Sequence, residues 1–142
     1  MELGVTRLHE GARLPSYSTP GSVGFDLWTA EPVRIEPMAI ELVGTGLVVA
    51  VPEGWCLLVS LRSSAPRRYG VTQPHGVGII DQDYRGPEDE LRIQLLNVGG
   101  SPVEIPAGTR LAQGVLLRSE QAAFVAHVPD GASRGGFGST GH

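Results

Sequence analysis

Short apolar runs alternate with turn signals along nearly the whole chain. In Leu91–Leu95 every second residue is apolar, as in a strand with one buried face. Pro-Gly, Gly-Gly-Ser-Pro and Pro-Ala-Gly sequences separate such runs at intervals of roughly 8 to 12 residues, a spacing typical of all-β barrels and sandwiches. The predicted strands are Val5–Leu8, Phe25–Thr29, Val33–Ile35, Ile40–Val43, Leu47–Val51, Trp55–Leu61, Val77–Ile80, Leu91–Asn97, Val103–Ile105, Leu111–Leu117 and Ala123–Val128.

Helical character is limited to short stretches, Ser63–Tyr69 and a turn near Ser119–Ala122. From about Pro129 the chain becomes rich in glycine and serine and loses its apolar pattern. The sequence therefore predicts one β-barrel domain over residues 1–128 and a flexible Gly-rich arm over residues 129–142.

The composition narrows the fold further. The 142 residues include 20 glycines and 11 prolines, which excludes a helical bundle because both are poor helix formers. Charged residues make up 18% of the chain, below the roughly 25% usual for soluble domains. We therefore expect another subunit to cover part of the surface.

The charge pattern bears on possible partners. A net charge of −4 without a basic run argues against non-specific binding of nucleic acid. All 11 basic residues are arginines, which reflects either codon usage or the fit of guanidinium groups to phosphate.

Cys56 stands alone, so we expect it in the core rather than in a disulfide or a zinc site. No leader or membrane-spanning run is evident, and we expect a cytoplasmic protein.

Four segments carry candidate chemistry. Residues 21–27 and Leu61–Ala65 both interrupt strands; the first is explained by a hairpin turn. The second offers an arginine and two hydroxyls, which suit either a phosphate cradle or a helix N-cap. In the third, an apolar strand leads into Asp81-x-Asp83-Tyr84, which holds a carboxylate beside buried surface as a general base requires. A hairpin with solvated aspartates is the alternative.

The fourth segment is the C-terminal arm. Gly136 and Gly141 have the spacing of a phosphate-binding loop, but His142 stands where such a loop has lysine. The arm is therefore no Walker A motif. Its glycines and hydroxyls can still wrap phosphates while Phe137 stacks on a base, unless the arm is simply a disordered linker.

Taken in order, these segments resemble the trimeric dUTP diphosphatases (dUTPases) over nearly the whole chain. Five short motifs carry the resemblance: Gly24–Leu27, Arg62–Ser64, Gly78–Gly86, Gly108–Gln113 and Arg134–Gly141. The resemblance implies a jelly-roll-like β-barrel that forms a homotrimer, with active sites at the subunit interfaces. It implies hydrolysis of dUTP to dUMP and pyrophosphate, which limits uracil incorporation into DNA and supplies dUMP for thymidylate synthesis. Mg²⁺ would be held by the substrate phosphates.

The resemblance also implies residue roles. Asp81 would activate the water that attacks the α-phosphorus, and Tyr84 would pack under the deoxyribose and exclude a 2′-hydroxyl. Asp26 and Asp83 would be structural groups near the site. The hairpin over residues 75–81 would read the uracil edge, and Phe137 would close over the base. The implied substrate-binding residues are Arg62, Ser63, Ser64, His75, Gly78, Ile79, Ile80, Tyr84, Arg92, Gln113, Arg134, Phe137, Gly138, Ser139 and Thr140, some of them reaching the site from a neighbouring subunit.

Three departures from the family pattern stand out. His75 replaces a common asparagine, the tail arginine lies at position 134 rather than 132, and Pro87–Asp89 form an insertion after Gly86. Two alternative functions remain. A dCTP deaminase of the same fold needs a glutamate where this chain has Gln94. A regulatory barrel that binds nucleotide without cleaving it would retain affinity and release no pyrophosphate.

Overall fold

The computed structural model describes residues 1–136 and is nearly all β. Five residues form the helix α1 (Ala65–Tyr69). Among the described residues, no helix is long and apolar enough to cross a membrane. The strands are β1 (Gly4–Arg7), β2 (Phe25–Trp28), β3 (Val33–Ile35), β4 (Ile40–Gly44), β5 (Leu47–Ala50), β6 (Trp55–Leu61), β7 (Val71–Thr72), β8 (Gly78–Ile80), β9 (Arg92–Asn97), β10 (Val103–Ile105) and β11 (Arg110–Arg118).

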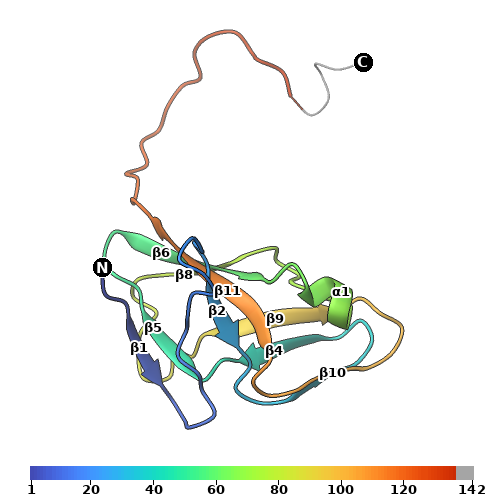
Figure 1. Cartoon of the computed structure of the whole chain (residues 1–142). Helices are drawn as coiled ribbons and strands as arrows, with labels where there is room; N and C mark the ends of the chain where they lie inside the picture. Colours follow the sequence, from blue (N-terminus) through green and yellow to red (C-terminus); the bar gives the residue numbers. More distant parts are fainter. Residues whose placement is uncertain (137–142) are drawn as a thin grey trace.

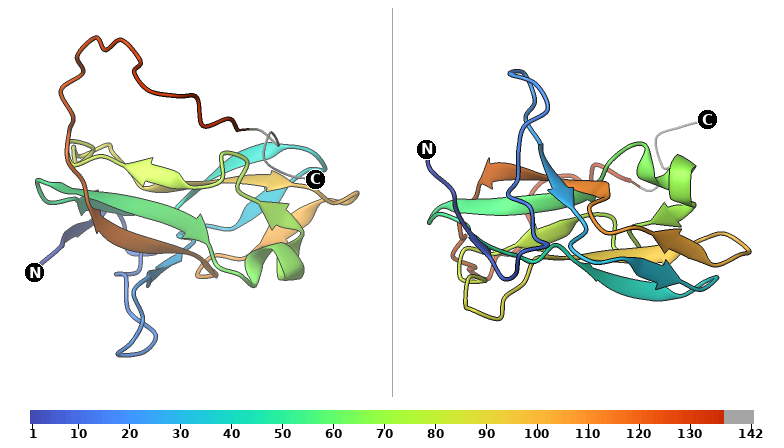
Figure 2. Two further views of the ribbon diagram at one scale, coloured as in Figure 1. Left: turned by 90° about the horizontal axis from the view of Figure 1, so that it is seen from above. Right: turned by 60° about the horizontal axis from the view of Figure 1, so that its bottom comes forward.

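Four small antiparallel sheets make up a jelly-roll fold. The largest has the order β2-β11-β6-β8, and a three-stranded sheet has the order β4-β9-β7. Two further strand pairs, β1-β5 and β10-β3, complete the wall of the fold. Within the described residues, no continuous hydrogen-bonded ladder closes this wall into a barrel. The two larger sheets lie on opposite sides of a common core (Figures 1 and 2). Strand β6 therefore runs through the middle of one wall, between β11 and β8.

The core follows the alternation seen in the sequence. Leu57 and Val59 of β6 point inward and are buried, as are Ile93 and Leu95 of β9. Because successive side chains in a strand point to opposite faces, the residues between them remain available for the outer surface. The predicted strands of the barrel are thus recovered, with small differences at their ends and with the addition of the short strand β7.

The predicted strand Ala123–Val128 is wrong. The chain leaves the sheet after Arg118, and residues 119–136 contain no helix or strand and extend away from the barrel (Figure 1). Phe124 is 97% exposed, and Val125 and Val128 are also exposed. An apolar run forms a strand only beside a partner strand, and the described part of this chain supplies none here.

Candidate active site

Asp81 lies at one end of β6. Strand β8 pairs with β6 in the register Leu57↔Ile80, so Asp81 emerges directly beside Cys56. Within residues 1–136 its carboxylate accepts no hydrogen bond, and the residue is exposed. Both oxygens are therefore open to a water molecule or a ligand.

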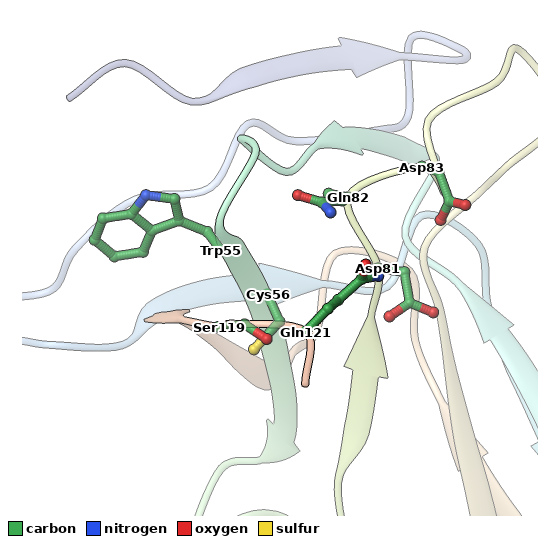
Figure 3. Close-up of a pocket in the computed structure, with 7 residues that line it drawn as sticks. All are labelled: Trp55, Cys56, Asp81, Gln82, Asp83, Ser119 and Gln121. Atoms are coloured by element: carbon green, nitrogen blue, oxygen red, sulfur yellow. The ribbon is translucent and has the colours of Figure 1, made fainter. Parts of the chain in front are cut away.

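A cavity of about 360 Å³ lies at this end of the strand (Figure 3). It is lined by Trp55, Cys56, Asp81, Gln82, Asp83, Ser119 and Gln121. The Gln82 side chain is held in place because its Oε1 accepts a hydrogen bond of 2.9 Å from the Gly54 N–H. Cys56, expected in the core, is half-buried and faces this cavity instead.

Arg62 lies at the opposite end of β6, where a buried carboxylate holds two guanidinium groups. Arg62 Nε lies 3.2 Å from Asp26 Oδ1, and Arg110 Nη1 lies 3.1 Å from Asp26 Oδ2. The Ser18 hydroxyl donates a further hydrogen bond to Asp26 at 2.7 Å. Asp26 is only 7% exposed, so it fixes the two arginines from behind rather than facing solvent. The two arginines carry one more positive charge than Asp26 neutralises.

These arginines line a second cavity, of about 320 Å³. Its lining comprises Arg62, Ser64, Ala65, Arg68, Tyr69, Gly108, Thr109 and Arg110. Ser64 occupies the N-cap position of α1, yet its side chain makes no capping hydrogen bond. A hydroxyl beside several guanidinium groups is a donor set suited to phosphate oxygens.

Gln113 and Ser63 lie near the same end of β6. Gln113 of β11 pairs with Ser60 of β6, and its Nε2 lies 3.5 Å from the Ser60 hydroxyl. Gly24 leaves room for the glutamine, since a Cβ there would lie 3.1 Å from Gln113 Oε1. Ser63 is exposed. The structure thus brings together Asp26, Arg62, Ser63, Ser64 and Gln113.

The hairpin before Asp81 contains a residue that the sequence analysis missed. Gln73 is buried, and its Nε2 donates to the Val59 carbonyl at 3.2 Å. The same Nε2 lies 3.4 Å from His75 Nε2. An amide nitrogen only donates, so a hydrogen bond here needs the tautomer with His75 Nε2 as the acceptor and the proton on Nδ1. Gln73 Oε1 is buried without a partner in the described chain.

The loop of the hairpin is exposed and turns at Gly76, whose φ of +80° favours glycine. Beyond it, β8 presents Gly78, Ile79 and Ile80 alongside β6, and Ile79 is largely exposed. The implied base-reading residues therefore lie between the two ends of β6. Gln73 lies between Thr72 and Pro74, outside every predicted strand and motif, so nothing in the sequence signals its contact with His75.

Two further candidates lie on other elements. Tyr84 follows Asp81 in a tight turn, in which the Tyr84 N–H lies 3.3 Å from the Asp81 carbonyl oxygen. Arg92, expected to bind substrate, belongs to β9 of the opposite sheet and forms an ion pair of 2.9 Å with Glu90. Arg134 lies in the exposed tail and lines neither cavity. Phe137, Gly138, Ser139 and Thr140 lie outside the described residues.

Comparison with known proteins identifies the family of this chain. Residues 10–141 match the dUTPase family. The chain belongs to the dUTPase family. A deoxyuridine 5′-triphosphate nucleotidohydrolase of Zymomonas mobilis is 41% identical over 146 residues, which cover 99% of this chain and 98% of the relative.

Solved structures of dUTPases share the fold. The dUTPase of Streptococcus mutans is 31% identical, with a TM-score of 0.78 over 87% of this chain and 100% of that one. A point variant of the dUTPase from phage phi11 of Staphylococcus aureus is 24% identical, with a TM-score of 0.79 over 92% of this chain and 98% of that one, and coordinates a structural Mg(II) ion. The predicted family and the all-β jelly-roll fold are both confirmed.

Proposed function

We propose that this protein hydrolyses dUTP to dUMP and pyrophosphate at sites shared between the subunits of a homotrimer. Membership of the dUTPase family supports the substrate and the reaction. The single observation that carries the proposal is the separation of an open carboxylate, Asp81, from an arginine-rich cavity at Arg62, at opposite ends of β6.

The reaction needs these two groups within the length of one nucleotide. The chain from Cys56, beside Asp81, to Arg62 is extended, and at about 3.3 Å per residue these ends lie about 20 Å apart. The phosphate chain of a nucleotide attacked next to Asp81 cannot reach Arg62 of the same chain. A second copy of the protein has to supply the arginine.

A trimer also suits the surface of the single chain. Ile40 and Leu42 project from the same outward face of β4 and are more than half exposed, and Phe124 is almost fully exposed. Exposed apolar side chains that lie next to each other on a strand face, such as Ile40 and Leu42, mark contact surfaces between proteins. Three copies related by a rotation would cover them and would create three equivalent sites.

The proposed chemistry begins with a water molecule held by Asp81. The carboxylate takes a proton from the water as its oxygen bonds to the α-phosphorus. The bond from the α-phosphorus to its bridging oxygen then breaks, and pyrophosphate leaves. Such a transfer depends on positioning and charge neutralisation more than on covalent chemistry.

Charge on the leaving pyrophosphate would be met by Arg62, Ser63, Ser64 and Gln113 of a neighbouring subunit. Asp26 keeps the guanidinium of Arg62 in a fixed direction, so little reorganisation is needed when phosphate binds. Arg134 and the arm residues Phe137, Gly138, Ser139 and Thr140 would close over the nucleotide and exclude water.

Recognition of the base and sugar falls to the segment around β8. Backbone groups of residues 75–81 would meet the uracil edge, with Gly78, Ile79 and Ile80 lining the base and His75 Nδ1–H offering a donor to a carbonyl oxygen. Tyr84 would pack against the deoxyribose. Arg92 would approach the nucleotide from β9, and Asp83 would hold the turn that carries Tyr84.

Mg²⁺ enters this proposal as part of the substrate. Among residues 1–136, no three histidine, cysteine, aspartate or glutamate side chains are grouped so that they could hold a metal ion. Hard cations such as Mg²⁺ prefer oxygen ligands, which the triphosphate supplies. The nucleotide would therefore bind as its magnesium complex.

The test is pyrophosphate release from a panel of deoxynucleoside and ribonucleoside triphosphates with Mg²⁺. We expect dUTP to be cleaved far faster than dCTP, dTTP or UTP, and sedimentation to give about three times the 15.0 kDa chain mass. Binding of dUTP without pyrophosphate release would instead identify a regulatory barrel, and release of ammonia from dCTP would identify a deaminase.

A further inference from the structure

The hydroxyl of Tyr84 is held by the loop that the insertion lengthens. Tyr84 Oη donates a hydrogen bond of 3.1 Å to the carbonyl oxygen of Glu90, across the turn that contains Pro87–Asp89. Inside this loop the Gly86 N–H donates to Asp89 Oδ2 at 2.6 Å. The Glu90 N–H donates to the Glu88 carbonyl at 2.9 Å. The insertion is therefore a closed turn rather than a loose excursion.

Glu90 is itself fixed to the barrel by both carboxylate oxygens. Its Oε1 accepts a hydrogen bond of 2.8 Å from the Gly46 N–H, and its Oε2 lies 2.9 Å from Arg92 Nε. The side chain is only 16% exposed. Gly44 makes room for it, because a Cβ at that position would lie 2.5 Å from Oε1.

The next residue continues the attachment. Leu91 is buried, and its N–H donates to the Leu47 carbonyl at 2.7 Å. Its own carbonyl accepts from the Thr45 hydroxyl at 2.6 Å. Tyr84 is thus tied by its hydroxyl to a backbone position that is anchored in the core. The ring is fixed at both ends, by its own backbone and by Glu90.

We propose that Glu90 is a positioning residue that sets the preference for deoxyribose by holding the Tyr84 ring in place; this rests on the function proposed above. An aromatic ring excludes a 2′-hydroxyl only while it cannot move aside. A ring released from its hydroxyl anchor gains side-chain freedom and yields to the added oxygen. The insertion, Glu90 and the Gly44–Gly46 turn therefore form the support of the sugar pocket.

The experiment compares kcat/KM for dUTP and for UTP in Tyr84→Phe, Glu90→Ala and the double variant. Tyr84→Phe keeps the ring and removes the anchor, so the dUTP:UTP ratio should fall about five- to tenfold, the worth of one hydrogen bond. Glu90→Ala should lower the ratio to a similar extent. The double variant should lose no more than either single variant, because both remove the same restraint.

Glu88→Ala is the matched control, because this glutamate lies in the same insertion and is exposed. It should leave the ratio unchanged. If Glu90→Ala fails to fold, the dUTP:UTP ratio is measured in Glu90→Gln, which keeps one hydrogen-bond acceptor. Its ratio should fall between those of the wild type and Tyr84→Phe.

Failure of this proposal is distinct from failure of the proposed function. A wild type that does not cleave dUTP would overturn the function. A wild type that cleaves dUTP, together with a Tyr84→Phe variant of unchanged dUTP:UTP ratio, would overturn the role of the anchor. Additive losses in the double variant would likewise overturn the coupling between Glu90 and Tyr84.

Discussion

Asp81 and Arg62 lie at the two ends of strand β6, about 20 Å apart along the chain direction. Each faces a cavity of its own, one with an open carboxylate and the other with several guanidinium groups. Neither cavity alone holds both a base and a set of phosphate ligands. In the proposed trimer, this separation makes assembly a requirement for catalysis rather than an accessory to it.

Replacement of Asp81 by asparagine should abolish most of the turnover. Asparagine keeps the size of the side chain but cannot take a proton from water, so kcat should fall by roughly 10²- to 10⁴-fold. The dissociation constant of a non-hydrolysable dUTP analogue should change little, because the base acts in the transition state. Steady-state kinetics and calorimetric titration measure the two effects. Near-normal turnover would assign the base to another residue.

Replacement of Asp26 by asparagine should weaken both the fold and phosphate binding. The change leaves Arg62 and Arg110 without their shared carboxylate, and the free energy of unfolding should fall by about 1–3 kcal/mol. The KM for dUTP should rise because Arg62 loses its fixed direction. Denaturant titration and kinetics measure these changes. Glu104→Gln, in the exposed ion pair with Arg34, is the control and should alter neither. Equal effects of both variants would deny Asp26 its positioning role.

His75→Ala should raise the KM for dUTP about tenfold while leaving kcat nearly unchanged, because the loss concerns a donor to the base rather than the reacting atoms. His75→Asn should restore most of the affinity, since an amide also offers a donor. A wild-type KM in His75→Ala would show that the imidazole only faces solvent.

Removal of residues 130–142 should leave the trimer folded and nearly inactive. The segment adds no side chain to the core within the described residues, so the thermal midpoint should not shift. The kcat should fall severely because nothing closes over the nucleotide. A truncated protein with full activity would reduce the arm to a linker.

Most of the barrel could be predicted from the sequence because the pattern of buried residues is local. The alternation in Leu91–Leu95 and the turn residues between strands specify β structure without reference to other chains. Ala123–Val128 has the same apolar signal but lacks a partner strand in the described chain. A single sequence does not distinguish a strand that pairs within its chain from an apolar segment that does not.

The site could be predicted only as a set of motifs. Arg62, Ser64 and Asp81 are recognisable by residue type and order, whereas their separation along β6 depends on the register of β8 and β11. The hydrogen bonds that anchor the residues around these motifs could not be predicted from the sequence. Glu90 follows the insertion directly, and its contact with Gly46 joins residues that are 44 positions apart in sequence.

The shared site is tested most directly by assembling Asp81→Asn and Arg62→Ala chains into mixed trimers. Homotrimers of either variant should be almost inactive, because every site lacks its base or its phosphate ligand. In a random 1:1 mixture, about a quarter of the interfaces should join an intact Asp81 to an intact Arg62 of the neighbouring subunit. Pyrophosphate release from dUTP should therefore return to about a quarter of the wild-type rate. Mixed trimers that remain as inactive as the homotrimers would contradict the account, because each site would then draw Asp81 and Arg62 from the same chain.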